Sequence, residues 1–217
     1  MEPKRPYSRP SMKPDSRPSS TPLLWVPLVL VLLAMGLRWM KLGSEGMTLL
    51  PNFAPWMALA FTGTLIFPRG SLPWWSWPLM LVAVDFAAMG AQLWSLADGR
   101  AEVFLTYGLY AGAAWTAHRM RGKAGILQSL AGVLVCGIVF YLVTNILCWW
   151  VKPYYAKDLA GLVQALTTGL PGFPPTWTFL RSSLLSDLGF SAILLAAANA
   201  EARVRSVPAL APAATRA

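Results

Sequence analysis

The chain has few of the residues on which metal proteins and disulfide-rich proteins depend. Only 12% of its 217 residues are charged, it has one histidine, His118, and it has two cysteines. Cys136 and Cys148 lie in one apolar segment, about 18 Å apart if that segment is helical, which is too far for a disulfide between them. A metal site at His118 is not expected without further His or Cys nearby. We therefore expect no metal and no cofactor.

The motifs of common catalytic sites are also missing from the sequence. It contains no glycine-rich nucleotide loop, no zinc-type histidine cluster and no serine elbow. No nucleophile, base and orienting group occur together, so an enzyme is not predicted. The net charge of +9 could suggest nucleic acid, but the basic residues are scattered through tails and short loops rather than gathered on a polar domain. Nucleic acid is therefore not an expected partner.

Apolar residues, by contrast, are abundant. They make up 56% of the chain, which includes eleven tryptophans, and this composition suits a chain whose solvent is largely lipid. A membrane-spanning helix needs about 20 mainly apolar residues. Six stretches meet this rule: residues 23–40, 52–68, 74–96, 101–118, 125–151 and 182–200. The sequence predicts an all-α integral membrane protein, a bundle of six transmembrane helices in the lipid bilayer.

The segments outside these stretches are polar or amphipathic. Residues 1–22 carry six prolines and five basic residues, so a disordered basic tail is predicted there. An uncleaved first span is favoured over a signal peptide because the apolar run continues to Met40. Residues 23–202 are predicted to form the transmembrane domain and residues 203–217 a flexible tail. Residues 159–170 have apolar residues at helical spacing but reach only about 18 Å, so they predict an amphipathic helix at the outer interface, between spans five and six.

The distribution of basic residues predicts the orientation of the bundle. If the N-terminus lies in the cytoplasm, the inner segments hold twelve basic residues and the outer segments hold six. Short cytoplasmic loops of membrane proteins carry an excess of Lys and Arg. The two-to-one bias therefore predicts that both termini are cytoplasmic.

Polar residues inside the apolar stretches define a candidate ligand site. An ionised side chain near the bilayer centre costs about 2.5–3.5 kcal/mol, so Asp85 and Asp187 are expected to have a partner or a function. Asp85 is predicted to lie about 16 Å deep, near the midplane, from its place in the third stretch. Asp187 and Asn145 are about five residues from the outer face, on which Asn52 also lies. Gln92 follows Asp85 by seven positions, on the same helix face.

These groups converge on the outer half of the bundle, as expected of a vestibule that binds a small ligand. Alternatively, Asn52, Asn145 and Asp187 form only interhelical hydrogen bonds or cap helix ends, and Asp85 pairs with a cation or is protonated. The interpretation favours packing for each Asn taken singly and a function for Asp85. Arg38 either pairs with an acidic group or extends to the interface, and extension is favoured.

Four sequence blocks resemble an uncharacterised bacterial membrane-protein family of unknown function. They are Pro51-Asn52-Phe53-Ala54-Pro55 followed by Ala58 to Gly63, then Thr144-Asn145, then Tyr155 to Leu162, and finally Arg181 to Leu188. The resemblance runs from about Arg38 to Ala200. It adds Lys157 and Arg181 to the candidate ligand residues. The chain departs from the family pattern at Ala156, where proline is expected, and at Ser182, where asparagine is usual.

Members of this family are described as similar to the substrate-binding (S) components of energy-coupling-factor transporters. That similarity implies a multi-pass subunit of the bacterial cytoplasmic (inner) membrane that captures a vitamin-like solute from outside. Its energy would come from a transmembrane coupling subunit and ATPases. We expect the ligand site to comprise Asn52, Asp85, Gln92, Asn145, Lys157, Arg181 and Asp187, with residues 157–181 as a lid. The rival interpretations are a structural or assembly membrane protein without a ligand and a proton-coupled carrier.

Overall fold

The computed structural model describes residues 25–43, 55–67, 72–90 and 100–210, and these residues are helical with short connections. The helices are α1 (Trp25–Gly43), α2 (Trp56–Ala58), the π-helical turn η1 (Leu59–Gly63), α3 (Thr64–Ile66), α4 (Ser76–Met89), α6 (Arg100–Met120), α7 (Ile126–Val151), α8 (Leu159–Leu166) and α9 (Thr176–Val204). Because α2, η1 and α3 follow one another without a break, we call residues 56–66 the central helix. The predicted all-α class is confirmed.

Each of the six apolar stretches contains a helical segment, but the bounds differ from those predicted. By length and composition, only α7 and α9 among the described helices could each cross a membrane, rather than all six segments. α1, the central helix and α4 have apolar runs that are too short, and α6 is long enough but not apolar enough. The helix predicted at residues 159–170 is present as α8.

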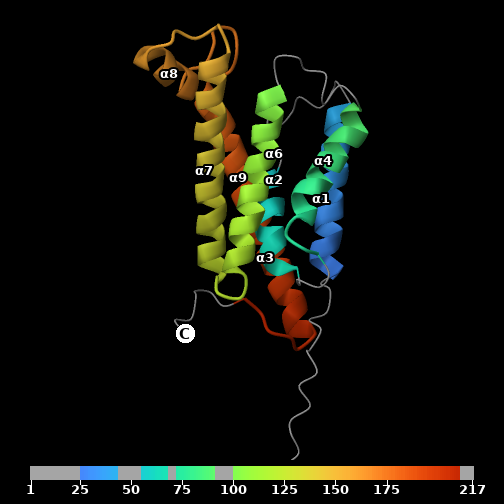
Figure 1. Cartoon of the computed structure of the whole chain (residues 1–217). Coiled ribbons are helices and arrows are strands. Elements are labelled where there is room, and N and C mark those ends of the chain that lie inside the picture. Colours follow the sequence, from blue (N-terminus) through green and yellow to red (C-terminus); the bar gives the residue numbers. More distant parts are fainter. Residues whose placement is uncertain (1–24, 44–54, 68–71, 91–99, 211–217) are drawn as a thin grey trace, which may run out of the picture.

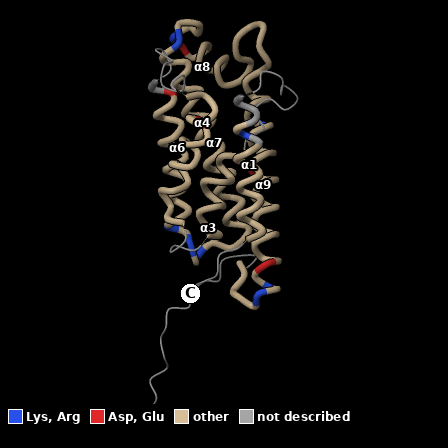
Figure 2. The backbone as a smooth tube through the Cα atoms, turned by 90° about the vertical axis from the view of Figure 1, so that its right-hand side faces the viewer, with Lys and Arg blue, Asp and Glu red and all other residues tan. Residues whose placement is uncertain are grey.

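α1, α4, α6, α7 and α9 run side by side as a bundle, and α8 projects from one end of it (Figure 1). We call this end the α8 end. α1, α4 and α7 end there, and α6 and α9 begin there, whereas the 121–125 turn lies at the opposite end. Charged residues lie mainly toward the two ends (Figure 2), and α7 has none along its 26 residues.

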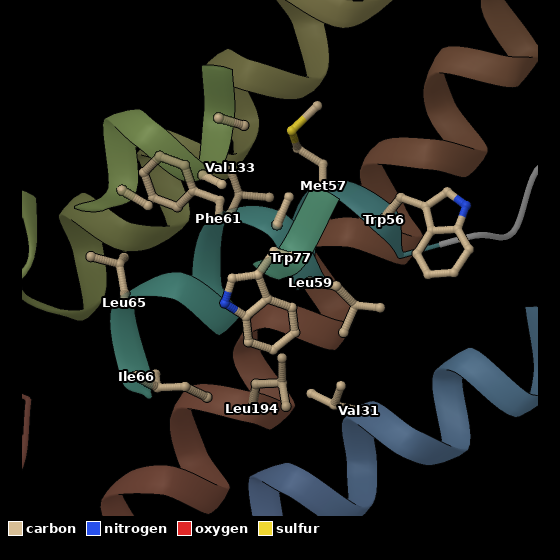
Figure 3. Packing of buried hydrophobic residues seen from close by; sticks show 14 of the residues in the cluster. Val31, Trp56, Met57, Leu59, Phe61, Leu65, Ile66, Trp77, Val133 and Leu194 are labelled. Atoms are coloured by element: carbon tan, nitrogen blue, oxygen red, sulfur yellow. The ribbon is translucent and has the colours of Figure 1, made fainter. Parts of the chain in front are cut away.

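The central helix lies in the middle of the bundle. All residues from Trp56 to Phe67 are buried. Figure 3 shows its side chains surrounded by Val31 of α1, Trp77 of α4 and Leu194 of α9. A helix of 11 residues is only about 16 Å long, so it cannot cross a bilayer alone.

Two glycines allow the other helices to approach the central helix closely. A Cβ atom at Gly132 of α7 would lie 2.2 Å from the ring of Phe61. A Cβ atom at Gly63 would lie 2.7 Å from the ring of Trp77. Both rings are fully buried and have little room to move. The core therefore depends on these two residues having no side chain.

The outward faces of the helices carry many large apolar side chains. Exposed examples are Val29 and Leu32 of α1, Val135 of α7, and Leu185 and Ile193 of α9. Soluble monomers rarely expose extended apolar surfaces. This surface, together with the length and composition of α7 and α9, supports an association with the membrane.

Candidate functional site

Asp187 caps the first turn of the central helix. Its carboxylate accepts hydrogen bonds from the backbone N–H of Ala58, at 3.1 Å, and of Met57. Asp187 belongs to α9 and is only 4% exposed. The first N–H groups of a helix have no partners within it, and a carboxylate satisfies them while opposing the positive end of the helix dipole. This role matches the capping alternative that the sequence left open.

The positions of the two aspartates along their helices differ from those predicted. Asp187 lies eleven residues, or about 16 Å, into α9, because this helix begins at Thr176 and not at residue 182. Asp85 lies only four residues, or about 6 Å, from the end of α4. The chain leaves α4 at Gly90, which has a φ of 59°. Asp85 is thus placed toward the α8 end and not at the middle of a long helix.

Asp85 joins three helices through a network of polar contacts. Arg38 of α1 donates from Nε to Oδ1 at 3.1 Å and from Nη2 to Oδ2 at 3.5 Å. The hydroxyl of Tyr107, on α6, donates to Oδ2 at 2.6 Å. The guanidinium also lies over the ring of Trp56, 5.3 Å from its centroid. The prediction that Arg38 extends to the interface is therefore wrong, because pairing compensates both charges within the bundle.

Two further charged residues satisfy helix ends, and no sequence pattern indicated either role. Glu201 of α9 accepts hydrogen bonds from the first two backbone N–H groups of α1, those of Trp25 at 3.0 Å and Val26 at 2.9 Å. At the far end of the central helix, Arg121 donates from Nε to the carbonyl oxygen of Thr64 at 2.8 Å, and from Nη2 to the same oxygen. The central helix is thus capped by opposite charges at its two ends, as its dipole favours.

Lys157 has a comparable role at the end of α7. Its ammonium group donates to the carbonyl oxygens of Trp149 and Lys152. Trp149 in turn donates from its indole nitrogen to the carbonyl oxygen of Ala156 at 2.7 Å. These contacts fix the connection to α8 against the C-terminus of α7. Lys157 therefore contacts backbone in the structure, whereas the resemblance had made it a ligand residue.

The structure does not bring the predicted ligand residues into one cluster. Asn145 donates to the carbonyl oxygen of Tyr141 within its own helix, at 2.8 Å. Arg181 is exposed, with its guanidinium over the ring of Trp177, 5.4 Å from the centroid. Asn52 and Gln92 lie outside the described residues. The described candidates thus have separate partners, and Asp85 alone among them lies in a network of side chains from several helices.

A groove between α6 and α7 was missed by the sequence reasoning. Its volume is ≈ 200 Å³, and its lining residues are Glu102, Leu105, Thr106, Phe140, Thr144, Leu147 and Cys148. The only signal in the sequence was Glu102, an acidic residue near the start of the apolar stretch 101–118. Within the part of the chain that the structure describes, no group of three or more His, Cys, Asp or Glu could hold a metal ion.

Comparison with known proteins identifies the family. The model of a family of unknown function, DUF6580, matches residues 18–210. This match spans most of the chain and confirms the resemblance to an uncharacterised family. No curated protein and no solved structure matches the chain. The similarity to S components therefore stays a prediction.

Proposed function

The chain belongs to this family of unknown function, DUF6580, and we propose that it is an integral membrane subunit that binds a small solute. Six passages with both termini in the cytoplasm would place the α8 end outside a bacterial inner membrane. The twelve-to-six bias of basic residues over the whole sequence supports this orientation. Arg119, Arg121, Lys123, Arg203 and Arg205 lie at the opposite end, on or after the ends of α6 and α9.

The network of Arg38, Asp85 and Tyr107 is the observation that carries the proposal. The other buried carboxylates, Asp187 and Glu201, accept hydrogen bonds from the first backbone N–H groups of helices. Asp85 instead binds side chains of α1 and α6. A buried ion pair is weak evidence for stability, since apolar residues of similar volume often serve as well or better. Its presence at this position is better explained by a binding role.

The chemistry of this network favours a solute that carries an anionic group. A guanidinium has five N–H donors, and two of them contact Asp85 in this structure. The side chain of Arg38 is 24% exposed, so it is accessible, whereas that of Asp85 is only 9% exposed. Trp56 adds an aromatic face under the guanidinium. A carboxylate or similar anion on a partly apolar solute suits this combination.

Energy for transport would have to come from outside the chain. The sequence carries no glycine-rich nucleotide loop, so a transmembrane coupling subunit and ATPases are the partners that this proposal implies. A structural membrane protein is the second candidate. The observation in its favour is that Asp187 and Lys157, both predicted ligand residues, bind backbone groups at helix ends.

The proposal is tested by native mass spectrometry of the gently purified full chain. The native protein should retain a small molecule. The double variant Arg38→Gln, Asp85→Asn removes both charges together, so no buried charge loses its partner and the fold should persist. We expect this variant to keep its melting temperature and to lose the retained mass, because one charge-assisted hydrogen bond contributes about 1.5–3 kcal/mol.

The control is Arg181→Gln, which also removes an arginine that lies over a tryptophan ring but lies outside the network. This variant should retain the molecule. A double variant that binds it as well as the native chain would show that the network is not the site. A native chain that purifies without any small molecule, together with a lowered melting temperature of the double variant, would favour the structural protein.

A further inference from the structure

We propose that the groove between α6 and α7 binds the head group of a phospholipid that carries a primary ammonium beside its phosphate, as phosphatidylethanolamine does. This site is separate from the Arg38 network and rests only on the membrane location of the bundle. It is argued from the charges at the mouth of the groove, its apolar depth and its size.

Opposite charges lie at the mouth of the groove, at the α8 end. Glu102 is the third residue of α6, and Lys152 directly follows the last residue of α7. The ammonium nitrogen of Lys152 lies 3.4 Å from Oε1 of Glu102. Each charge also opposes the dipole of its own helix end, so this arrangement is electrostatically favourable. A head group with one positive and one negative charge is complementary to this pair.

Glu102 has hydrogen-bonding capacity that the described residues do not use. Its Oε1 atom is buried and accepts no hydrogen bond from them, even though Lys152 is within ion-pair distance. The ammonium of Lys152 compensates the charge of this oxygen, but the oxygen can still accept a hydrogen bond from a further donor. A primary ammonium has N–H groups to donate, whereas the quaternary nitrogen of choline has none. The groove should therefore distinguish these two head groups.

Deeper in the groove the lining becomes apolar. Phe140 lies eleven residues, or about 16 Å, below the end of α7, and Leu105 and Leu147 lie between it and the mouth. All seven lining residues are partly exposed, so the groove is accessible from the surface of the bundle. Charge at the mouth and apolar side chains below it match the head and the first part of the chains of a phospholipid.

The size of the groove also favours a lipid head group over a free solute. Its cavity volume is ≈ 200 Å³. Sites that enclose a small-molecule ligand are commonly about 300–1,000 Å³ and bury most of the ligand surface. The exposed ring of Trp150, on the last turn of α7, is typical of residues at the membrane interface. A head group at this level needs to be only partly enclosed.

Cys148 lines the groove and serves as a native reporter of its occupancy. In a Cys136→Ala background it is the only thiol of the chain. The full chain is placed in nanodiscs of phosphatidylglycerol mixed with either phosphatidylethanolamine or phosphatidylcholine, with identical acyl chains. We expect N-ethylmaleimide to alkylate Cys148 several-fold more slowly in the ethanolamine nanodiscs. Native mass spectrometry should show preferential retention of phosphatidylethanolamine over phosphatidylcholine.

Glu102→Gln should abolish both differences, because the amide removes the negative charge while keeping the volume. Asp158→Asn is the matched control: it removes a carboxylate at the same end of the bundle that does not line the groove, so both differences should persist. Equal alkylation and equal lipid retention in the two nanodiscs would overturn the proposal. Soluble glycerophosphoethanolamine could instead slow the alkylation of Cys148 in choline nanodiscs while the choice of lipid has no effect. That result would overturn the lipid proposal and indicate that the groove binds a free zwitterionic solute.

Discussion

Replacing Asp187 by alanine should weaken the whole bundle, because this carboxylate satisfies the first turn of a helix that begins inside the protein. The backbone N–H groups of Met57 and Ala58 both donate to it. Trp56, Met57 and Ala58 are each no more than 4% exposed, so water cannot replace the lost acceptor without a rearrangement. The variant leaves two buried donors without partners.

The expected loss follows from these two donors. A buried donor left unsatisfied costs about 1–3 kcal/mol, so Asp187→Ala should lower the free energy of unfolding by about 2–6 kcal/mol. Asp187→Asn keeps one amide oxygen that can accept from one of the two donors, and it should lower the free energy of unfolding by about 1–3 kcal/mol. The loss of charge opposite the helix N-terminus contributes to this smaller effect.

Titration of the full chain with sodium dodecyl sulfate in mixed micelles measures these free energies. The matched control is Asp158→Ala, which removes a carboxylate that caps α8 by accepting from the backbone N–H of Gly161 at 2.8 Å. Asp158 is exposed and α8 lies at the edge of the bundle, so its loss should cost about 1 kcal/mol or less. The reasoning would be refuted if Asp187→Ala were as stable as the native chain or cost no more than the control.

Two further predictions concern packing and topology. Gly132→Ala should cost about 1–3 kcal/mol, because the new methyl group meets the buried ring of Phe61. Gly112→Ala, whose Cβ meets nothing within 4 Å, should be neutral or stabilising by up to about 1 kcal/mol, and equal stability of the two variants would contradict the packing argument. Reporter fusions should read inside, outside, inside and outside after Pro73, Gly99, Lys123 and Pro171, respectively. A reporter at the C-terminus that reads outside would overturn the topology.

The helical segments could be predicted from the sequence because long apolar runs have few alternatives in a chain with so little charge. Their ends were less predictable. The last stretch was expected to begin at residue 182, after Arg181, since a charge usually marks the end of an apolar run. In the structure α9 begins six residues earlier, directly after Pro175, and Arg181 stays on its exposed face over Trp177. A side chain that can extend outward did not need to interrupt the helix.

The partners of the charged residues could not be predicted, because they are set by tertiary structure. Asp187 and Ala58 are 129 positions apart in the sequence, and Arg38 and Asp85 are 47 apart. No local pattern encodes such contacts. The sequence did show that Asp85 and Asp187 required an explanation, and it offered pairing and capping as alternatives to ligand binding. The two carboxylates take one of these alternatives each, according to the groups that they face.

Two kinds of partner can offset the free-energy cost of a buried charge in an apolar bundle. They are the end of a helix and a side chain of opposite charge. Asp187 takes the first, and its removal would leave the first N–H groups of the central helix without an acceptor. Asp85 takes the second, and a neutral pair of side chains could replace Arg38 and Asp85 without leaving any backbone group unpaired. Removal of Asp187 should therefore lower stability, whereas joint neutralisation of Arg38 and Asp85 should preserve stability and remove binding. If joint neutralisation of Arg38 and Asp85 lowered stability, and removal of Asp187 abolished binding but preserved stability, the pair would be structural and Asp187 would be the binding residue.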